Sequence, residues 1–336
     1  MTEPHPFAKY VQTIARGPNL SRPLTEEEMA QATNMILDDQ VDPLQMGAFL
    51  CVLRVRTEDP GETAGFVRVV KERIQIPKDA PDVDLDWSSY AGKKRQLPWF
   101  LLSALLLADS GIKVFMHGTE GHTEGRLYSR DALSVMGIGH VTSMEEAANQ
   151  IRERNFSYLP LQYLMPKLQD IMDLKPILGV RTPINTFTRM LNPFDAPYSL
   201  QSVFHPNYGE IHREASVLLK QPHMAVFKGE GGEGERRPAK PVVVESLHDG
   251  VSSDEEWPAM LPGVTAHHDE EMNPDRLLAL WRGDDDDQIG TNAVIGTTAI
   301  ALRLMGRAGN PIDATKQATE MWENRAGQPL NTKNAA

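Results

Sequence analysis

Apolar positions in the first part of the chain recur at helical spacing, and helix start signals divide them. Thr25 can cap a helix, and Glu28, three residues later, occupies the second position of a capping box. Pro43 and Pro60 each open a further helix, since proline is tolerated in a first turn. This pattern predicts a small all-α domain over residues 1–75.

The periodicity changes after residues 76–86, a Pro- and Asp-rich stretch typical of a connector. Helices are predicted over residues 99–108, 131–136, 144–154 and 292–304, and short apolar strands over residues 112–116, 156–161, 224–227 and 241–245. Helices that alternate with buried strands indicate a large α/β domain with a mostly parallel central sheet flanked by helices. We expect it over residues 76–325, followed by a frayed tail over residues 326–336.

The composition is that of an ordinary soluble protein. Of 336 residues, 40% are hydrophobic and 24% are charged. The single cysteine, Cys51, excludes a disulfide framework and a cysteine-based zinc site. No apolar run approaches the roughly 18 residues of a membrane span, and the N-terminus lacks the basic-then-apolar pattern of an export signal. We therefore expect a cytoplasmic protein without a membrane partner.

The charge is unevenly distributed. The net charge of −12 comes from 34 Lys and Arg against 46 Asp and Glu, which argues against a protein that coats nucleic acid with its whole surface. A local basic groove stays open, because the distribution of charge matters more than its sum. Acidic residues gather at residues 82–86, 230–235, 252–256 and 284–287, and basic residues gather at residues 93–95 and 236–237.

Motifs spread along the chain carry a resemblance to a known family. The helical region contains Leu24-Thr25-Glu26-Glu27-Glu28 and Pro43-Leu44-Gln45-Met46-Gly47-Ala48, and the α/β region contains Leu178-Gly179-Val180-Arg181-Thr182-Pro183-Ile184-Asn185 and Leu191-Asn192-Pro193. In this order they resemble the anthranilate phosphoribosyltransferases and pyrimidine nucleoside phosphorylases, with the L-G-x-R-T-x-x-N…L-x-N-P signature of the transferase branch. The resemblance implies a small α domain hinged to a large α/β domain, and homodimers formed through the helical domain.

The chain departs from this family at the turn that binds a ribosyl pyrophosphate. Family enzymes carry GTGGDG there, where glycines let backbone amides approach the phosphates and a helix end adds positive potential. Counted back from His117-Gly118, which matches the family's H-G, the turn falls on residues 88–93 and the following T-x-N-x-S-T stretch on residues 96–101. Pro98 replaces the family asparagine, and nearly every phosphate-contacting residue is absent.

In exchange, the turn gains three cations, because Gly92 is followed by Lys93, Lys94 and Arg95. Adjacent cations attract phosphate with less geometric selection than a cradle of amides does. A solvated basic turn is the usual role of such a run and is the alternative here. The place of the run in the family fold favours contact with phosphate.

A Gly- and Glu-rich loop over residues 229–235 follows the predicted strand at 224–227. The resemblance implies a magnesium site there, which the enzymes form with an adjacent Asp-Glu pair that this chain lacks. Glu230 and Glu233 could still bind a hard cation, since magnesium needs only one or two carboxylates plus phosphates. A flexible acidic loop without metal is the competing interpretation.

Other polar residues are ambiguous. Lys175 stands where the resemblance implies an Arg that contacts the aromatic amine, and Lys lacks the flat two-pronged contact to a carboxylate. Arg181 could either contact a ligand or stabilise the fold. His117, His205 and His212 lack the spacing of a metal motif, so structural roles are favoured for them, although His117 lies beside the expected anion site.

The first functional hypothesis is a binding protein. The chain resembles the divergent branch without GTGGDG, whose phosphoribosyltransferase-fold proteins bind nucleic acid. This resemblance implies a basic groove between the domains that binds single-stranded DNA or RNA and requires no cofactor. Tyr90 and Trp99 could offer stacking faces. The candidate phosphate-contacting residues are Gly92, Lys93, Lys94, Arg95, His117, Lys175, Arg181, Lys228, Arg236 and Arg237.

The second hypothesis is a phosphoribosyl or glycosyl transferase with an altered substrate and magnesium as cofactor. Catalysis there consists mostly of positioning and charge stabilisation. It needs few side chains, so a remodelled site could still work. A folded relic that acts as an interaction module is the third possibility. The sequence favours polyanion binding and leaves the alternatives open.

Overall fold

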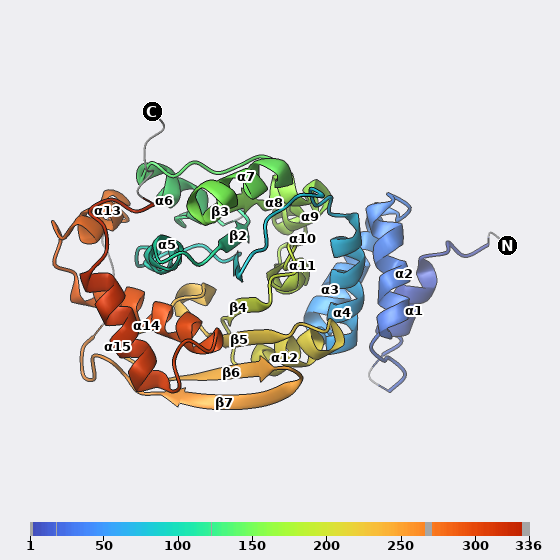
Figure 1. Cartoon of the computed structure of the whole chain (residues 1–336). Coiled ribbons are helices and arrows are strands. Elements are labelled where there is room, and N and C mark those ends of the chain that lie inside the picture. The colour runs from blue at the N-terminus through green and yellow to red at the C-terminus, as the bar shows by residue number, and fades with distance from the viewer. Residues whose placement is uncertain (1–2, 18, 122, 266–270, 331–336) are drawn as a thin grey trace.

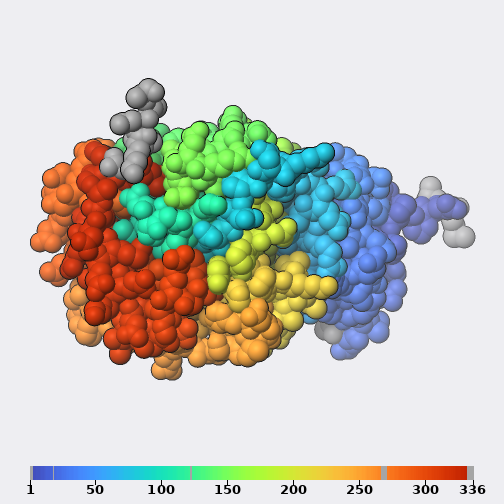
Figure 2. Space-filling view, in the orientation of Figure 1, coloured from blue at the N-terminus to red at the C-terminus, as the bar shows by residue number. Residues whose placement is uncertain are grey.

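The computed structural model describes residues 3–17, 19–121, 123–265 and 271–330. A helical domain lies at one end of the molecule, and an α/β domain forms the rest (Figure 1). In the space-filling view the helical domain (blue) packs directly against the larger domain, and the C-terminal helices (red) lie at the opposite end (Figure 2). The helical domain consists of α1 (Ala8–Ala15), α2 (Glu26–Leu37), α3 (Pro43–Arg56) and α4 (Pro60–Arg73).

The α/β domain alternates strands and helices. Its strands are β1 (Leu85–Ser89), β2 (Val114–Gly118), β3 (Phe156–Pro160), β4 (Tyr198–Val203), β5 (His223–Lys228), β6 (Val242–His248) and β7 (Val251–Trp257). Its α-helices are α5 (Phe100–Asp109), α6 (Ser129–Val135), α7 (Met144–Arg154), α8 (Leu161–Leu164), α9 (Pro166–Met172), α10 (Lys175–Leu178), α11 (Ile184–Phe187), α12 (Tyr208–Leu218), α13 (Asp275–Arg282), α14 (Gln288–Leu304) and α15 (Pro311–Glu323). Two 3₁₀ turns complete it, η1 (Thr188–Met190) and η2 (Glu230–Gly232).

The helices of the small domain begin where the sequence predicts. The Thr25 hydroxyl accepts from the Glu28 N–H while the Glu28 carboxylate accepts from the Thr25 N–H, which completes the capping box of α2. Aspartates cap α3 and α4, and each is followed by a proline in the first turn. Helix α1, which the pattern did not single out, buries Tyr10 and Ile14 against this bundle.

Seven strands form one sheet in the order β3-β2-β1-β4-β5-β6-β7. The first five are parallel to one another, and β6 and β7 form an antiparallel hairpin at one edge. The predicted α/β domain with a mostly parallel sheet is therefore confirmed. Among the described residues, no helix is both long enough and apolar enough to cross a membrane.

Three strands were not predicted. Strand β1 begins inside the expected connector, because its apolar residues, Leu85 and Trp87, alternate with polar ones that are buried nonetheless. The polar composition of β4 hid it in the same way, since Ser199, Gln201 and Ser202 are buried. Strand β7 coincides with the acidic run at residues 252–256, whose side chains an exposed edge strand tolerates.

Helices cover both faces of the sheet. One face packs against α5, α6, α13, α14 and α15, and nearly all of α5 is buried in that core. The other face packs against α7, α8, α9 and α11, and the helical domain joins the same core through α4. The small domain is thus packed onto the large one through α4, which contacts α11 and α12 (Figure 1).

Candidate functional site

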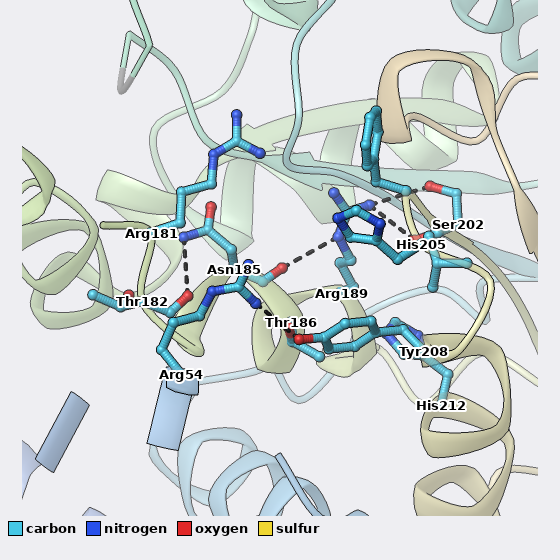
Figure 3. Close-up of a pocket in the computed structure, with 12 residues that line it drawn as sticks. Arg54, Arg181, Thr182, Asn185, Thr186, Arg189, Ser202, His205, Tyr208 and His212 are labelled. Atoms are coloured by element: carbon cyan, nitrogen blue, oxygen red, sulfur yellow. Dashed lines mark hydrogen bonds between the residues drawn. The ribbon is translucent and has the colours of Figure 1, made fainter. Parts of the chain in front are cut away.

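An open pocket lies at the carboxyl end of β4, next to the helical domain (Figure 3). Strands β1 and β4 are neighbours from which the chain runs in opposite directions across the sheet, and such a switch point is where open α/β sheets bind ligands. The helical domain contributes Arg54, from the last turn of α3, and the α/β domain contributes η1 and the segments that follow α10 and β4. The site therefore belongs to both domains.

Two contacts build the walls of this pocket. The Arg54 guanidinium donates to the Tyr208 hydroxyl at 2.8 Å, which joins α3 to the start of α12 (Figure 3). The buried Arg189 donates from Nη1 to the carbonyl and hydroxyl of Ser202, both at 3.1 Å, and to the carbonyl of Gly232 at 2.9 Å. Arg189 thereby fixes the end of β4 to the loop over residues 229–235.

Arg181, which lines the pocket, lies close enough to further cations to be repelled by them. Burial lowers the pKa of Arg181, and the charges of Arg126 and Arg54 lower it further. Burial also lowers the pKa of Lys175, with additional repulsion from Arg181 and Arg126. In the described part of the chain, Arg54, Arg126 and Arg181 have no carboxylate within ion-pair distance. An arrangement of this kind is stabilised by an anion placed between the cations.

The turn after β1 is held by the protein itself. Gly92 adopts a φ of +66°, a conformation that favours glycine, so that its N–H and that of Ala91 point the same way. Both donate to Oε1 of Glu233, at 2.7 Å from Ala91 and 2.5 Å from Gly92. On the opposite side, the Arg126 guanidinium donates to the carbonyls of Ala91 and Gly92 at 2.9 and 2.8 Å. The turn thus connects an acidic loop with the cation cluster.

A buried ion pair lies beside this turn. Lys93, only 2% exposed, places its Nζ 2.6 Å from Oε1 of Glu235. The other oxygen of Glu235 accepts from the N–H of Phe100 at 2.9 Å, at the start of α5. Burial raises the pKa of Glu235, and the charge of Lys93 acts against that rise.

Three of the residues expected to contact phosphate are buried. Lys93 and Arg236 are buried, and Arg236 stacks on Trp257, donates to the carbonyl of Pro258 and has a pKa that burial lowers to about 10. His117 is also buried, where its Nδ1 lies 2.7 Å from the Tyr90 hydroxyl. These side chains stabilise the interior, so in this conformation they do not reach a ligand.

The remaining candidates divide into two groups. Lys175 and Arg181 lie in the cation cluster, as the hypothesis of a basic groove requires. Lys94 and Arg95 are exposed on the segment before α5, and Lys228 and Arg237 are partly exposed around the loop over residues 229–235. Nothing in the structure places these four in the pocket beside Arg54.

Three arginines near the site were not predicted from the sequence: Arg54, Arg126 and Arg189. Arg54 and Arg189 lie within or near the motifs that carry the resemblance, which was a usable signal. Arg126 has no such signal, because it reaches the turn after β1 from a loop more than thirty residues later, as its bond to Gly92 spans 34 positions.

Two models of one glycosyl transferase family match the chain. Its helical bundle domain matches residues 8–74, and its a/b domain matches residues 100–327. The chain belongs to glycosyltransferase family 3. This confirms the coarse part of the resemblance, that of an anthranilate phosphoribosyltransferase-like protein with a helical and an α/β domain.

Individual relatives of this family 3 protein are distant. The anthranilate phosphoribosyltransferase of Burkholderia mallei is 28% identical over 235 residues, which are 68% of this chain and 67% of that protein. An uncharacterized protein of Aquifex aeolicus is 29% identical over 68% of this chain and 70% of its own length.

Solved structures agree in fold. The anthranilate phosphoribosyltransferase of Thermus thermophilus has a TM-score of 0.77 at 22% identity, covering 95% of this chain and 94% of its own. The anthranilate phosphoribosyltransferase of Saccharomyces cerevisiae, in complex with phosphoribosyl pyrophosphate (PRPP) and Mg, has a TM-score of 0.75 at 17% identity. The match covers 97% of this chain and 95% of that one.

The residues of this chain do not fit PRPP and magnesium as they stand. The turn amides and the start of α5, the features that bind anions, are already satisfied by Glu233 and Glu235. Oε1 of Glu233 is occupied by the turn amides, whereas its Oε2 is buried without a hydrogen-bond partner among the residues that the structure describes. Glu230 lies 4.0 Å from Arg237. Within the described residues, no three His, Cys, Asp or Glu side chains gather into a possible metal site.

Proposed function

We propose that this family 3 protein binds single-stranded nucleic acid through the cleft between its helical and α/β domains. The observation that carries the proposal is the cation cluster of Arg54, Arg126, Lys175 and Arg181, which gathers charge from separate segments without pairing its arginines to carboxylates. Holding like charges together costs free energy that a bound polyanion offsets. Phosphate groups along a strand supply that compensation at several points.

A base-contacting surface adjoins the cations. Phe204 lines the same pocket and is 56% exposed, with His205 packed edge-on beside it at 4.9 Å between ring centroids. Exposed rings beside a basic groove stack with unpaired bases of any sequence. This favours a single strand over a duplex, whose bases are already stacked on each other.

Binding should depend steeply on salt. A fluorescein-labelled oligonucleotide is expected to bind at low salt, with log K falling against log salt by roughly 0.7 for each phosphate neutralised. With three or four cations in contact, the slope is about −2 to −3. Fluorescence anisotropy over a salt series measures it, and the matching duplex serves as the control. Absence of binding at low salt, or binding that salt does not weaken, contradicts the proposal.

An altered transferase is the second candidate, supported by relatives named for anthranilate phosphoribosyl transfer. Calorimetric titration with PRPP and magnesium tests it separately. Saturable binding followed by turnover of PRPP with an acceptor favours the enzyme, whereas heat of dilution alone favours the binding protein.

We also propose that two copies associate through the helical domain. On α3, Leu44, Ala48, Cys51 and Val55 follow one another at helical spacing on one face, and Leu44 and Val55 are 85% and 87% exposed. A dimer would cover this stripe and bring two clefts near each other. Light scattering after size-exclusion chromatography should give twice the chain mass of 37.4 kDa for the wild type. Val55→Asp, which places a charge in the stripe, should give the mass of one chain. A wild-type monomer at micromolar concentration contradicts this.

A further inference from the structure

We infer that the loop over residues 229–235 acts as a built-in anion, in which the Glu233 carboxylate takes the place of a small phosphate ligand and excludes it. The cleft then binds long polyanions that contact its outer cations. The amides of Ala91 and Gly92, which form an inner amide cradle, are not available to free diphosphates. This goes beyond nucleic-acid binding, since it concerns which anions the site rejects.

The first support is the geometry of Glu233. Its side chain is fully buried, and a single oxygen, Oε1, accepts both turn amides, from Ala91 and Gly92. Two backbone N–H groups that converge on one oxygen form the usual contact of a bound phosphate oxygen. The cradle is therefore formed in this protein, and its occupant belongs to the chain.

The second support comes from Glu235, two residues further along. It accepts from the first N–H of α5, at Phe100, and its charge is met by Lys93. The start of a helix is the other feature that attracts anions in such folds. One loop thus delivers two carboxylates to the two features that otherwise hold phosphate.

The third support is electrostatic. Burial lowers the pKa of Arg189, and among the described residues the charge of Glu233 acts to raise it again. Glu233 also acts to raise the pKa of Arg181. Its removal leaves two unsatisfied amides beside two arginines, which is an environment that attracts a multivalent anion.

The fourth support is the shape of the loop, which is tight where the sequence suggested flexibility. A Cβ on Gly229 would lie 1.7 Å from the Glu233 carbonyl oxygen, and one on Gly234 would lie 2.6 Å from Nε1 of Trp87. Gly231 and Gly232 have φ of +67° and +91°. The glycines are therefore required to carry the carboxylate into the cradle.

Glu233→Ala tests this inference with inorganic pyrophosphate as the probe. Millimolar pyrophosphate should raise the melting temperature of the wild type much less than that of the variant, because only the outer cations are open to it. The variant should melt lower without the probe and recover as pyrophosphate is added, in the way ligand linkage requires. Its affinity for pyrophosphate should exceed that of the wild type at least about tenfold. Glu230→Ala, in the same loop but without contact to the amides, is the matched control and should behave as the wild type.

Two results would overturn the inference. In the first, the wild type binds pyrophosphate as tightly as Glu233→Ala does. In the second, Glu233→Ala folds but does not bind pyrophosphate. If Glu233→Ala does not fold, hydrogen exchange on the wild type decides. Slow exchange at the Ala91 and Gly92 amides that pyrophosphate leaves unchanged supports the inference, and a change on adding pyrophosphate overturns it. None of these measurements uses an oligonucleotide, so their failure is distinct from failure of the proposed function.

Discussion

Lys93→Met is expected to lower the free energy of unfolding by about 3–5 kcal/mol at pH 7, because it leaves the buried Glu235 carboxylate without its cation. Burial already raises the pKa of Glu235, and loss of Lys93 removes the charge that opposes this rise. A carboxyl whose pKa is higher in the folded than in the unfolded state binds its proton more tightly when folded. Stability is then lost as pH rises through the folded pKa and regained as pH falls. The deficit should therefore be smaller at pH 5 than at pH 7 in urea unfolding followed by circular dichroism.

The neighbouring Lys94 provides a matched control, since it is exposed and Lys94→Met should change stability by no more than about 0.5 kcal/mol. Lys93→Met combined with Glu235→Gln should recover most of the loss, because the buried charge is removed while an oxygen stays to accept from the N–H of Phe100. If Lys93→Met were as mild as Lys94→Met and instead weakened oligonucleotide binding, Lys93 would be a ligand contact and the structural role described above would be wrong.

Arg54→Ala combined with Arg181→Ala should weaken oligonucleotide binding roughly 10- to 100-fold at low salt. The two guanidiniums reach the cleft from opposite domains, and neither has a carboxylate partner among the described residues. Losing two phosphate contacts should reduce the salt slope by about 1.4, because each contributes roughly 0.7 for a single strand. Anisotropy titrations at several salt concentrations measure both quantities.

Arg307→Ala is the control for this pair, since Arg307 is exposed just beyond the end of α14 and does not line the pocket. Arg181→Lys should keep most of the salt slope, because the charge remains. Arg54 also bonds to Tyr208, so the melting temperature of each variant is compared with that of the wild type. Equal losses from Arg307→Ala and from the cleft pair would mean that binding does not use the cleft.

Local signals in the sequence were sufficient for much of the fold. The capping box at Thr25, the prolines of α3 and α4 and the alternation of helices with apolar strands each correspond to elements in the structure. Strand β1 was missed because Asp86, Ser88 and Ser89 are polar yet buried, and burial of polar groups depends on partners that the local pattern does not reveal.

The residues of the site were harder to predict than the fold, because tertiary contacts decide in which direction each side chain points. Three consecutive cations looked equivalent in sequence, yet the turn at Gly92 sends Lys93 inward to Glu235 and leaves Lys94 and Arg95 outside. The partners Lys93 and Glu235 are 142 residues apart, so neither segment predicts the other. The same separation explains why a loop of glycines and glutamates resembled a flexible segment.

The acidic strand β7 has a consequence for how a polyanion approaches. It is the outermost strand of the sheet, so one side of its backbone lacks a pairing partner, and Asp254, Glu255 and Glu256 line it. Their charge repels the edge of a second sheet and so discourages intermolecular stacking. It also repels phosphate, so we expect a polyanion to avoid this edge of the sheet and to approach the arginine-lined pocket instead.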